Sequence, residues 1–300
     1  MVEYHRDYLP HEQTKEEGKA MTYRTICERL TRAGIESAEW DAQLLLEQFC
    51  PSVAMRAVLD STLEFESTEA LEEAIARREC RYPLQYILGE WQFYRQTYEV
   101  TPDCLIPRAD TEILVEEAIK RLPKNARFAD LCTGSGCIAI SVLAERPDTT
   151  AIAVDKFEDT LKLAVRNAQR NGVADRMQAL CRDVLADRFL KGQEGAFDAI
   201  LSNPPYIPTA VVDTLDAEVH AEPRAALDGG NDGLIFYRTM VEHAAAYLKP
   251  DGFFLFEIGF DQADALRQIG AQYGFFGYRM LRDYGGNDRV VCLWREGRIN

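Results

Sequence analysis

Apolar residues along this chain follow a helical period in its first third and a mixed strand and helix pattern further on. Within residues 21–88 they recur every three or four positions, which predicts a small all-helical region. Two helices in it have recognisable N-caps, because a Ser or Thr precedes each apolar series. The caps, with the residues expected on the apolar face behind them, are Ser37 with Trp40, Leu44 and Leu45, and Thr68 with Leu71, Ala74 and Ile75.

The pattern changes at Gly89. Aromatic and β-branched residues are frequent in 89–106, which predicts a short hairpin or connecting ribbon. Asp110 follows and is a predicted N-cap for the next helix. The apolar positions expected on that helix are Leu114, Ala118 and Leu122.

From about residue 126, short apolar runs alternate with helical patterns, which predicts a mostly parallel sheet with helices on both faces. Asn171-Gly172 and Lys249-Pro250-Asp251-Gly252 are predicted helix stops. Few residues separate the last two strands, so we expect them to form an antiparallel pair at the sheet edge. The predicted strands are 127–131, 151–155, 177–181, 197–202, 253–258, 275–282 and 289–294, and the predicted helices are 137–145, 158–170, 233–247 and 261–272.

These patterns divide the chain into four segments. Residues 1–20 are polar and acidic and resemble neither a secretory signal nor a transit peptide, so we interpret them as a flexible extension. A helical domain follows at 21–88, a hairpin linker at 89–106 and an α/β domain at 107–300.

Composition and charge narrow the class of protein. No apolar run approaches the roughly 20 residues of a membrane span. The net charge of −15 opposes non-specific binding to nucleic acid and would attract a partner with a basic surface. The eight cysteines include no CxxC pair and the four histidines are scattered, so we expect no disulfide framework and no metal site. Free thiols are typical of a reducing compartment, and we expect a cytoplasmic protein.

A glycine-rich turn joins the first strand of the α/β domain to its first helix. Such a turn lets a ligand approach the backbone closely, and we expect Cys132, Thr133, Gly134, Ser135 and Gly136 to bind a cofactor there. Residues 134–139 also match the nucleotide-binding pattern G-x-G-x-x-A, which is compatible with NAD and with S-adenosyl-L-methionine. Three strands end in aspartates, and their positions favour the methyl donor. Asp130 would suit an ammonium group, Asp155 the ribose hydroxyls and Asp183 an adenine amino group.

The tetrapeptide Asn203-Pro204-Pro205-Tyr206 follows an apolar strand. Both prolines fix their own φ angles and push the residue before them into an extended conformation. The Asn203 side-chain oxygen and the Pro204 carbonyl are therefore left as outward acceptors, and Tyr206 adds a flat aromatic face. Together they predict a socket for a planar NH2 group, with Asn203, Pro204 and Tyr206 as catalytic residues.

With these motifs in family order, the chain resembles the release-factor glutamine N5-methyltransferases, also called HemK-like methyltransferases, over about residues 21–295. The motifs are Arg81–Gly89, Leu105-Ile106-Pro107-Arg108 through Glu112, Asp130–Gly136, Asn203–Tyr206, Glu222–Leu227, Phe256-Glu257-Ile258-Gly259 and Asp283–Val291. The resemblance implies a class I (Rossmann-like) methyltransferase fold with a seven-stranded sheet, after a helical domain that helps to hold the protein substrate. It implies S-adenosyl-L-methionine as cofactor, with S-adenosyl-L-homocysteine as product.

The resemblance also implies a reaction and its partners. The substrate would be the glutamine of the Gly-Gly-Gln motif in class I peptide-chain release factors. Cofactor contacts would include Val184 beside Asp183, and Asn203. Substrate contacts would include Asn203, Pro204, Pro205, Tyr206 and Arg108. We expect a monomer without membrane or direct nucleic-acid binding. Two positions depart from the family pattern, because Cys132 stands where Gly is common and Val184 where an aromatic residue is frequent.

Three alternatives share parts of this pattern. A sister family methylates a glutamine of a large-subunit ribosomal protein, and the segment ending in Glu112 together with Arg81–Gly89 favours the release-factor branch. Adenine-N6 nucleic-acid methyltransferases share the tetrapeptide, but the charge of −15 disfavours them. A non-catalytic nucleotide-binding module would leave the tetrapeptide without a role.

Overall fold

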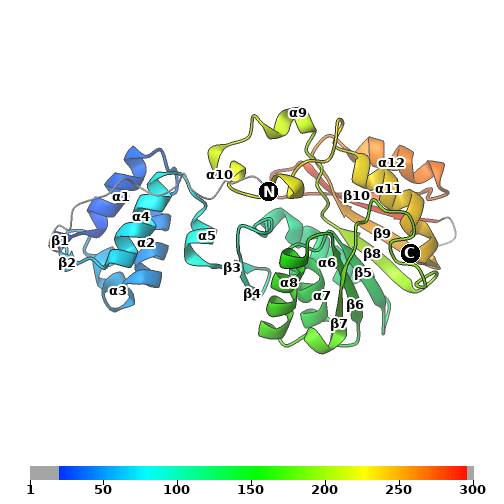
Figure 1. Cartoon of the computed structure of the whole chain (residues 1–300), viewed down its shortest axis with the longest axis horizontal. Coiled ribbons are helices and arrows are strands. Elements are labelled where there is room, and N and C mark those ends of the chain that lie inside the picture. The colour runs from blue at the N-terminus through cyan, green and yellow to red at the C-terminus, as the bar shows by residue number, and fades with distance from the viewer. Residues whose placement is uncertain (1–19, 296–300) are drawn as a thin grey trace. The chain divides into compact units, whose positions relative to one another are not determined.

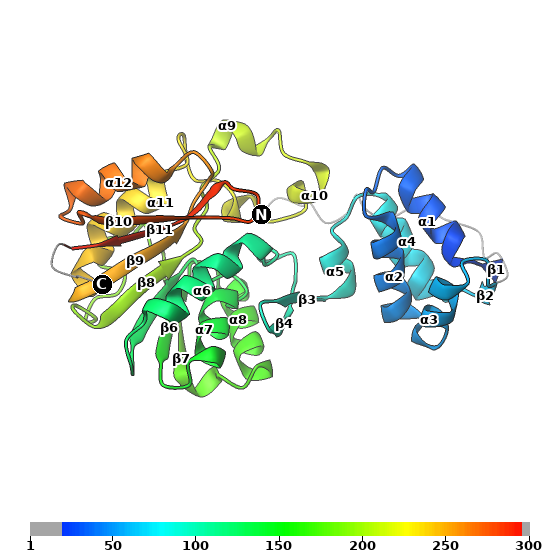
Figure 2. The ribbon, with the colours of Figure 1, turned by 180° about the vertical axis from the view of Figure 1, so that it is seen from behind.

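The computed structural model describes residues 20–295, and the predicted extension lies outside them apart from its last residue. The chain forms two compact units, which Figures 1 and 2 show from opposite sides. Of the described residues, one unit contains 20–89 together with Asp216–Ala221. The other contains Glu90–Leu215 and residues 222–295.

The first unit is a bundle of helices with a small two-stranded ribbon (Figure 1). The predicted cap at Thr68 is confirmed, since its hydroxyl accepts a hydrogen bond from the Leu71 N–H over 3.1 Å. Leu71, Ala74 and Ile75 are buried as expected. The elements are β1 (Ala20–Met21), α1 (Tyr23–Arg32), α2 (Ala38–Phe49), α3 (Pro51–Leu59), β2 (Phe65–Glu66), α4 (Glu69–Glu79), α5 (Leu84–Leu88) and α10 (Ala217–His220).

Helix α2 differs from its prediction at two side chains. Ser37 occupies the N-cap position, but its hydroxyl donates to the Asp41 carboxylate at 2.7 Å instead of capping the backbone. Trp40 is 56% exposed, whereas Leu45 is buried. Five residues turn an α-helix by about 140° beyond a full turn, so Trp40 and Leu45 cannot share one narrow apolar face.

The second unit is built on a seven-stranded sheet in the order β10-β11-β9-β8-β5-β6-β7. The five strands from β9 to β7 pair in parallel, and β10 and β11 are antiparallel, as the sequence predicts. The strands are β5 (Arg127–Leu131), β6 (Thr150–Asp155), β7 (Met177–Cys181), β8 (Phe197–Ser202), β9 (Leu248–Glu257), β10 (Gly277–Arg282) and β11 (Asp288–Trp294).

Helices cover both faces of this sheet (Figures 1 and 2). Side chains of α6 (Glu112–Arg121), α7 (Cys137–Glu145) and α8 (Glu158–Arg170) pack in one core with Phe128 of β5. Residues of α11 (Ile235–Thr239) and α12 (Ala263–Gln272) pack in the other core with Leu131 of the same strand. A short helix, α9 (Thr209–Val212), completes the unit. The architecture is that of a class I methyltransferase, in which ligands bind beyond the carboxyl ends of the parallel strands.

The predicted hairpin is present as β3 (Glu90–Phe93) paired with β4 (Gln96–Glu99). Within the second unit, this hairpin is held against α8 by Asn167, which is fully buried. The Asn167 side chain accepts from the Glu99 N–H at 2.7 Å and donates to the Ser135 carbonyl at 3.0 Å. One asparagine thereby joins the hairpin to the glycine-rich turn.

Three local predictions are wrong. Residues 233–247 are not one α-helix, because α11 passes into a π turn (Met240–Ala244) and a 3₁₀ turn (Ala245–Tyr247), and apolar spacing does not distinguish these forms. Lys249–Gly252 lie within β9, which starts early because Leu248 pairs with Phe197 across a register shift. Asp110 lies inside a 3₁₀ turn, η1 (Ala109–Thr111), and does not cap α6.

Candidate active site

The carboxyl ends of β5, β6 and β8 border a cavity of about 360 Å³. Most of the residues predicted from sequence line it, from both the cofactor set and the substrate set. Those on its wall are Arg108, Cys132, Thr133, Gly134, Ser135, Asp155, Asp183, Val184, Asn203 and Pro205. Asp130, Gly136, Pro204 and Tyr206 are not among the lining residues and lie in the surrounding structure.

The glycine-rich turn takes a left-handed backbone at three of its five residues. The φ angles are +58° at Cys132, +56° at Gly134 and +83° at Gly136. The φ of Gly136 favours glycine, and a Cβ there would also lie 2.8 Å from Ile140 Cδ1, so that side chain would have to shift. Cys132 accepts the same backbone with a side chain, at a cost in strain of about 1–2 kcal/mol.

Asp130 supports this turn from beneath. It is fully buried, and one carboxylate oxygen, Oδ2, accepts from Thr133 Oγ1 at 2.6 Å and from the Ala139 N–H at 3.1 Å. The other oxygen has no hydrogen-bond partner among the described residues. Burial raises the pKa of Asp130 to about 7, against the two hydrogen bonds, which favour the ionised form. Its predicted contact with an ammonium group stays a prediction.

Asp155 ends β6, and Asp183 lies two residues beyond the end of β7. The two Asp155 oxygens accept from the backbone N–H groups of Gly134 at 3.0 Å and Phe157 at 3.1 Å, and burial raises the pKa of this carboxyl. Asp183 is more exposed. Partial burial opposes its ionisation, but the Lys156 ammonium at 2.8 Å and the Leu185 N–H hold its pKa below the usual value. Both side chains therefore offer acceptor oxygens to the cavity.

The tetrapeptide lies at the end of β8, where two glycines press against it. A Cβ on Gly229 would meet the Pro205 carbonyl at 2.8 Å, and one on Gly233 would meet the Tyr206 carbonyl at 2.3 Å. That Tyr206 carbonyl also accepts from Gln262 Nε2 at 2.9 Å. The corner is therefore fixed by its neighbours as well as by its prolines.

Arg108 enters the cavity wall from the segment before α6. Its guanidinium forms an ion pair with Glu222, whose second oxygen accepts from the Ile106 N–H at 3.0 Å. Glu222 is buried, and this raises its pKa, while Arg108 acts in the opposite direction. The family motifs around Arg108 and Glu222 are thus parts of one contact.

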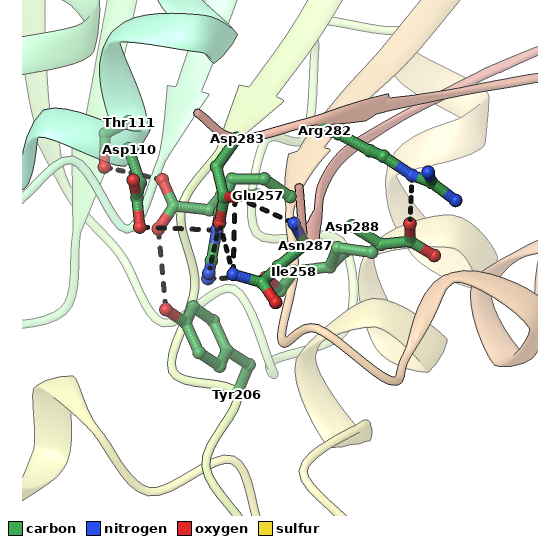
Figure 3. A network of polar contacts seen from close by, with 10 residues as sticks. Asp110, Thr111, Tyr206, Glu257, Ile258, Arg282, Asp283, Asn287 and Asp288 are labelled. Atoms are coloured by element: carbon green, nitrogen blue, oxygen red, sulfur yellow. Dashed lines mark hydrogen bonds and ion pairs between the residues drawn. The ribbon is translucent and has the colours of Figure 1, made fainter. Parts of the chain in front are cut away.

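A buried network behind the tetrapeptide was not predicted (Figure 3). Asn203 Nδ2 donates to Thr111 Oγ1 at 3.2 Å, and Thr111 Oγ1 donates to the Glu257 carboxylate at 2.5 Å. The Tyr206 hydroxyl makes a long hydrogen bond of 3.5 Å to the other oxygen of Glu257. The sequence feature that could have indicated this network is the acidic residue Glu257 at the end of the apolar run Phe253–Glu257. A carboxylate at such a buried position is unusual unless it is hydrogen-bonded or paired with a cation.

Two features are absent from the residues between 20 and 295. None of their helices combines the length and the apolar character needed to cross a membrane. No group of three or more His, Cys, Asp and Glu side chains in this part of the chain is arranged to hold a metal ion.

Comparison with known proteins identifies both units. The model of the PrmC N-terminal domain matches residues 22–89, and that of the methyltransferase small domain matches residues 109–259. A solved methyltransferase structure from Pyrococcus furiosus has the same fold, with a TM-score of 0.50 and 18% identity over 66% of this chain and 88% of that one.

Curated relatives are similar over most of the sequence. The release factor glutamine methyltransferase of Geobacter sulfurreducens is 40% identical over 266 residues, which cover 87% of this chain and 91% of the relative. That of Moorella thermoacetica is 39% identical, covering 89% of this chain and 95% of the relative. This chain therefore belongs to the release factor glutamine methyltransferase family.

Proposed function

We propose that this enzyme transfers the methyl group of S-adenosyl-L-methionine to the side-chain nitrogen N5 of the glutamine in the Gly-Gly-Gln motif of a class I peptide-chain release factor. The observation that carries this proposal is the rigid corner at Asn203–Tyr206, which borders a cavity lined by carboxylates. The likeness to curated release factor enzymes supports the choice of substrate.

The cavity suits S-adenosyl-L-methionine in size and in chemistry. Its volume of about 360 Å³ falls in the range of sites for molecules of this kind. Each oxygen of a carboxylate has two acceptor positions, so Asp155 can bind ribose hydroxyls while it still accepts from the Gly134 and Phe157 N–H groups. Asp183 would accept from the adenine amino group, with Val184 beside it. Thr133, Gly134 and Ser135 would lie against the remainder of the molecule.

The reacting nitrogen needs help, because its lone pair is delocalised into the amide carbonyl. When bound, the cofactor supplies a methyl group activated by its positive sulfur. Asn203 Oδ1 and the Pro204 carbonyl would accept from the glutamine NH2 group and hold its nitrogen in line with that methyl group. These contacts strengthen as the nitrogen gains positive character in the transition state. Tyr206 would cover the amide plane and exclude water. Methyl transfer first gives an N-protonated, positively charged N-methyl amide, which is strongly acidic and loses its proton readily, so no general base is needed before attack.

The partner would be bound through more than its glutamine. We assign the recognition of further parts of the release factor to the helical unit at residues 22–89, which matches the PrmC N-terminal domain. Arg108 would contact the substrate near the cavity. The net charge of −15 favours a partner with a basic surface, as expected for a factor that works beside ribosomal RNA.

A methyl-transfer assay with a radiolabelled cofactor tests this function directly. Three acceptors are compared at equal concentration: a class I release factor, a large-subunit ribosomal protein and DNA. We expect label in the release factor alone, and none when the motif glutamine is replaced by alanine. Label in the ribosomal protein or DNA, with none in the release factor, would refute the proposal.

A further inference from the structure

We infer that Thr111 and Glu257 are positioning residues, which orient the Asn203 carboxamide so that its oxygen and not its NH2 group meets the substrate glutamine. The inference rests on the proposed function and adds two residues to it. Neither of them lines the cavity. Thr111, in η1, contacts Asn203 directly, and Glu257, at the end of β9, would act on Asn203 through Thr111. Figure 3 shows the contact between Thr111 and Glu257.

The hydrogen bond between Thr111 and Glu257 has a defined direction. The two side chains lie 2.5 Å apart, and each residue is only 1% exposed, so water does not compete with their contact. An ionised carboxylate accepts hydrogen bonds and cannot donate them. When Glu257 is ionised, the single hydroxyl proton of Thr111 must therefore point at it.

This direction determines how the Asn203 side chain is oriented. With its proton used, Thr111 Oγ1 can serve Asn203 only as an acceptor. The group that lies 3.2 Å away must then be the NH2 end of the Asn203 side chain, and the oxygen end is turned to the other side. Asn203 lines the cavity, so this leaves Oδ1 as the acceptor available there.

The orientation matters because the substrate offers a donor. A glutamine NH2 group has two N–H bonds and needs acceptors around it. If Asn203 were flipped, two NH2 groups would face each other and the hydrogen bond that strengthens during methyl transfer would be lost. An asparagine without a partner has no reason to prefer either orientation, and Thr111 supplies that reason.

The charges around Glu257 come from several elements. Burial raises its pKa to about 7, and the Thr111 hydrogen bond and the Arg289 guanidinium of β11 favour the ionised form. Asp110 of η1 opposes ionisation. The other neighbours are the hydroxyl of Tyr206, which faces the carboxylate, and the hydroxyl of Tyr237 on α11, which donates to the Glu257 carbonyl at 2.8 Å.

Arg289, the cation near Glu257, is itself held in place by neighbouring groups. Arg289 forms an ion pair with Asp283 at 2.9 Å and donates to the Ile258 carbonyl at 3.3 Å. The Asn287 N–H binds the same Asp283 carboxylate at 2.8 Å (Figure 3). The motifs at 256–259 and 283–291, which no cofactor or substrate contact explains, thus support the carboxylate behind the tetrapeptide.

The test compares Thr111→Val with Thr111→Ser. Valine keeps the shape and removes the hydroxyl, whereas serine keeps the hydroxyl. We expect Thr111→Val to lower kcat by about 10- to 100-fold, less than the loss of the transition-state partner Asn203 itself, and serine to restore most of it. The KM for the release factor and the affinity for S-adenosyl-L-homocysteine should change little. Thr149→Val is the matched control, because Thr149 is a buried threonine whose hydroxyl donates to the Arg146 carbonyl at the opposite end of the sheet.

A second measurement does not depend on methyl transfer. Nuclear magnetic resonance can follow water exchange of the Asn203 side-chain amide protons, whose signal is identified by its loss in Asn203→Ala. We expect faster exchange in Thr111→Val than in the wild type, and wild-type rates in Thr149→Val. If Thr111→Val does not fold, Glu257→Gln gives the same readout.

The two proposals fail in different ways. A wild-type enzyme that does not methylate the release factor would refute the proposed function, and the amide exchange would still decide the role of Thr111. If Thr111→Val methylates the release factor within about threefold of the wild-type kcat, or if its Asn203 amide exchanges at the wild-type rate, the positioning role is refuted.

Discussion

The two sides of the cavity differ in how far apart along the chain their hydrogen-bonded residues lie. On the β5, β6 and β7 side, Asp130 binds groups three and nine residues away, and Asp155 binds one 21 residues away. On the β8 and β9 side, Asn203 binds a residue 92 positions away, and Thr111 binds one 146 positions away. The side proposed to bind the cofactor is thus built largely from neighbouring turns, and the side proposed to bind the substrate amide, called the acceptor side below, from distant segments.

This contrast suggests a division of labour. The first side presents backbone and carboxylate groups that bind, so changes there should weaken cofactor affinity. The second side fixes the direction of acceptor atoms, so changes there should lower kcat and leave cofactor affinity close to the wild-type value. The following substitutions test whether the two sides are independent.

The largest effect is expected from Asn203→Ala. Because the variant removes an acceptor that strengthens in the transition state, kcat/KM for the release factor should fall about 100-fold or more. Single-turnover methylation measures the effect on the chemical step, and calorimetry with S-adenosyl-L-homocysteine should show only a modest loss of affinity. Methylation by the variant at nearly the wild-type rate would remove Asn203 from the reaction.

Asp155→Ala should have the opposite profile. Loss of charged hydrogen bonds should weaken cofactor binding by about 1.5–3 kcal/mol, measured by calorimetry. Asp198→Ala is the matched control, since Asp198 also accepts from a backbone N–H, that of Arg127 at 2.9 Å, at the opposite end of the sheet. Equal affinities for Asp155→Ala and the control would place the ribose elsewhere.

The same contrast explains which parts of the site can be predicted from the sequence. Asp130, Asp155 and Asp183 were found as candidates because each follows an apolar run, and the hydrophobic pattern locates strand ends well. The tetrapeptide was found because two prolines restrict the backbone wherever they occur. These signals are local, and they need no knowledge of the tertiary fold.

The partners of the tetrapeptide carry no comparable signal. Along the chain, Thr111 and Glu257 are 146 positions apart, with most of the sheet's strands between them. Only the order of the strands in the folded sheet brings the two residues together. The same tertiary contacts explain the error at Asp110, whose carboxylate lies 3.5 Å from the Arg289 guanidinium and does not cap a helix. A capping preference of about 1 kcal/mol is easily overridden by such contacts.

Gly233→Ala tests how rigidly the acceptor side is held. An added Cβ would lie 2.3 Å from the Tyr206 carbonyl oxygen, at a residue whose φ is +73°. Gly274→Ala is the matched control, because Gly274 has a φ of +84° with nothing near its Cβ. Both variants bear the backbone strain, and only the first displaces the tetrapeptide. We therefore expect Gly233→Ala to lose about 1–3 kcal/mol more stability in chemical denaturation. Equal losses would mean that the corner yields easily.

The smallest effect expected is a pH dependence that belongs to the acceptor side. Burial raises the pKa of Glu257 from 4.5 to about 7. Above that pH the carboxylate accepts from Thr111 and fixes the orientation of Asn203. Below it the protonated carboxyl can donate to Thr111, whose own proton is then free to turn toward Asn203, and the orientation is lost. The wild-type kcat should therefore fall by up to about tenfold between roughly pH 8 and pH 6.

Glu257→Gln separates this dependence from that of the cofactor side. Glutamine does not titrate, so kcat of the variant should be low and nearly constant over the same pH range, with saturating cofactor. Burial also raises the pKa of Asp130 to about 7, and Asp130 is intact in both proteins. A fall in kcat at low pH that persists in the variant would therefore come from Asp130 beneath the glycine-rich turn. The same acid decline in Glu257→Gln as in the wild type would contradict control by Glu257. It would also mean that the two sides of the cavity are not independent, because the ionisation of Asp130 beneath the glycine-rich turn would then control the rate of methyl transfer at the tetrapeptide.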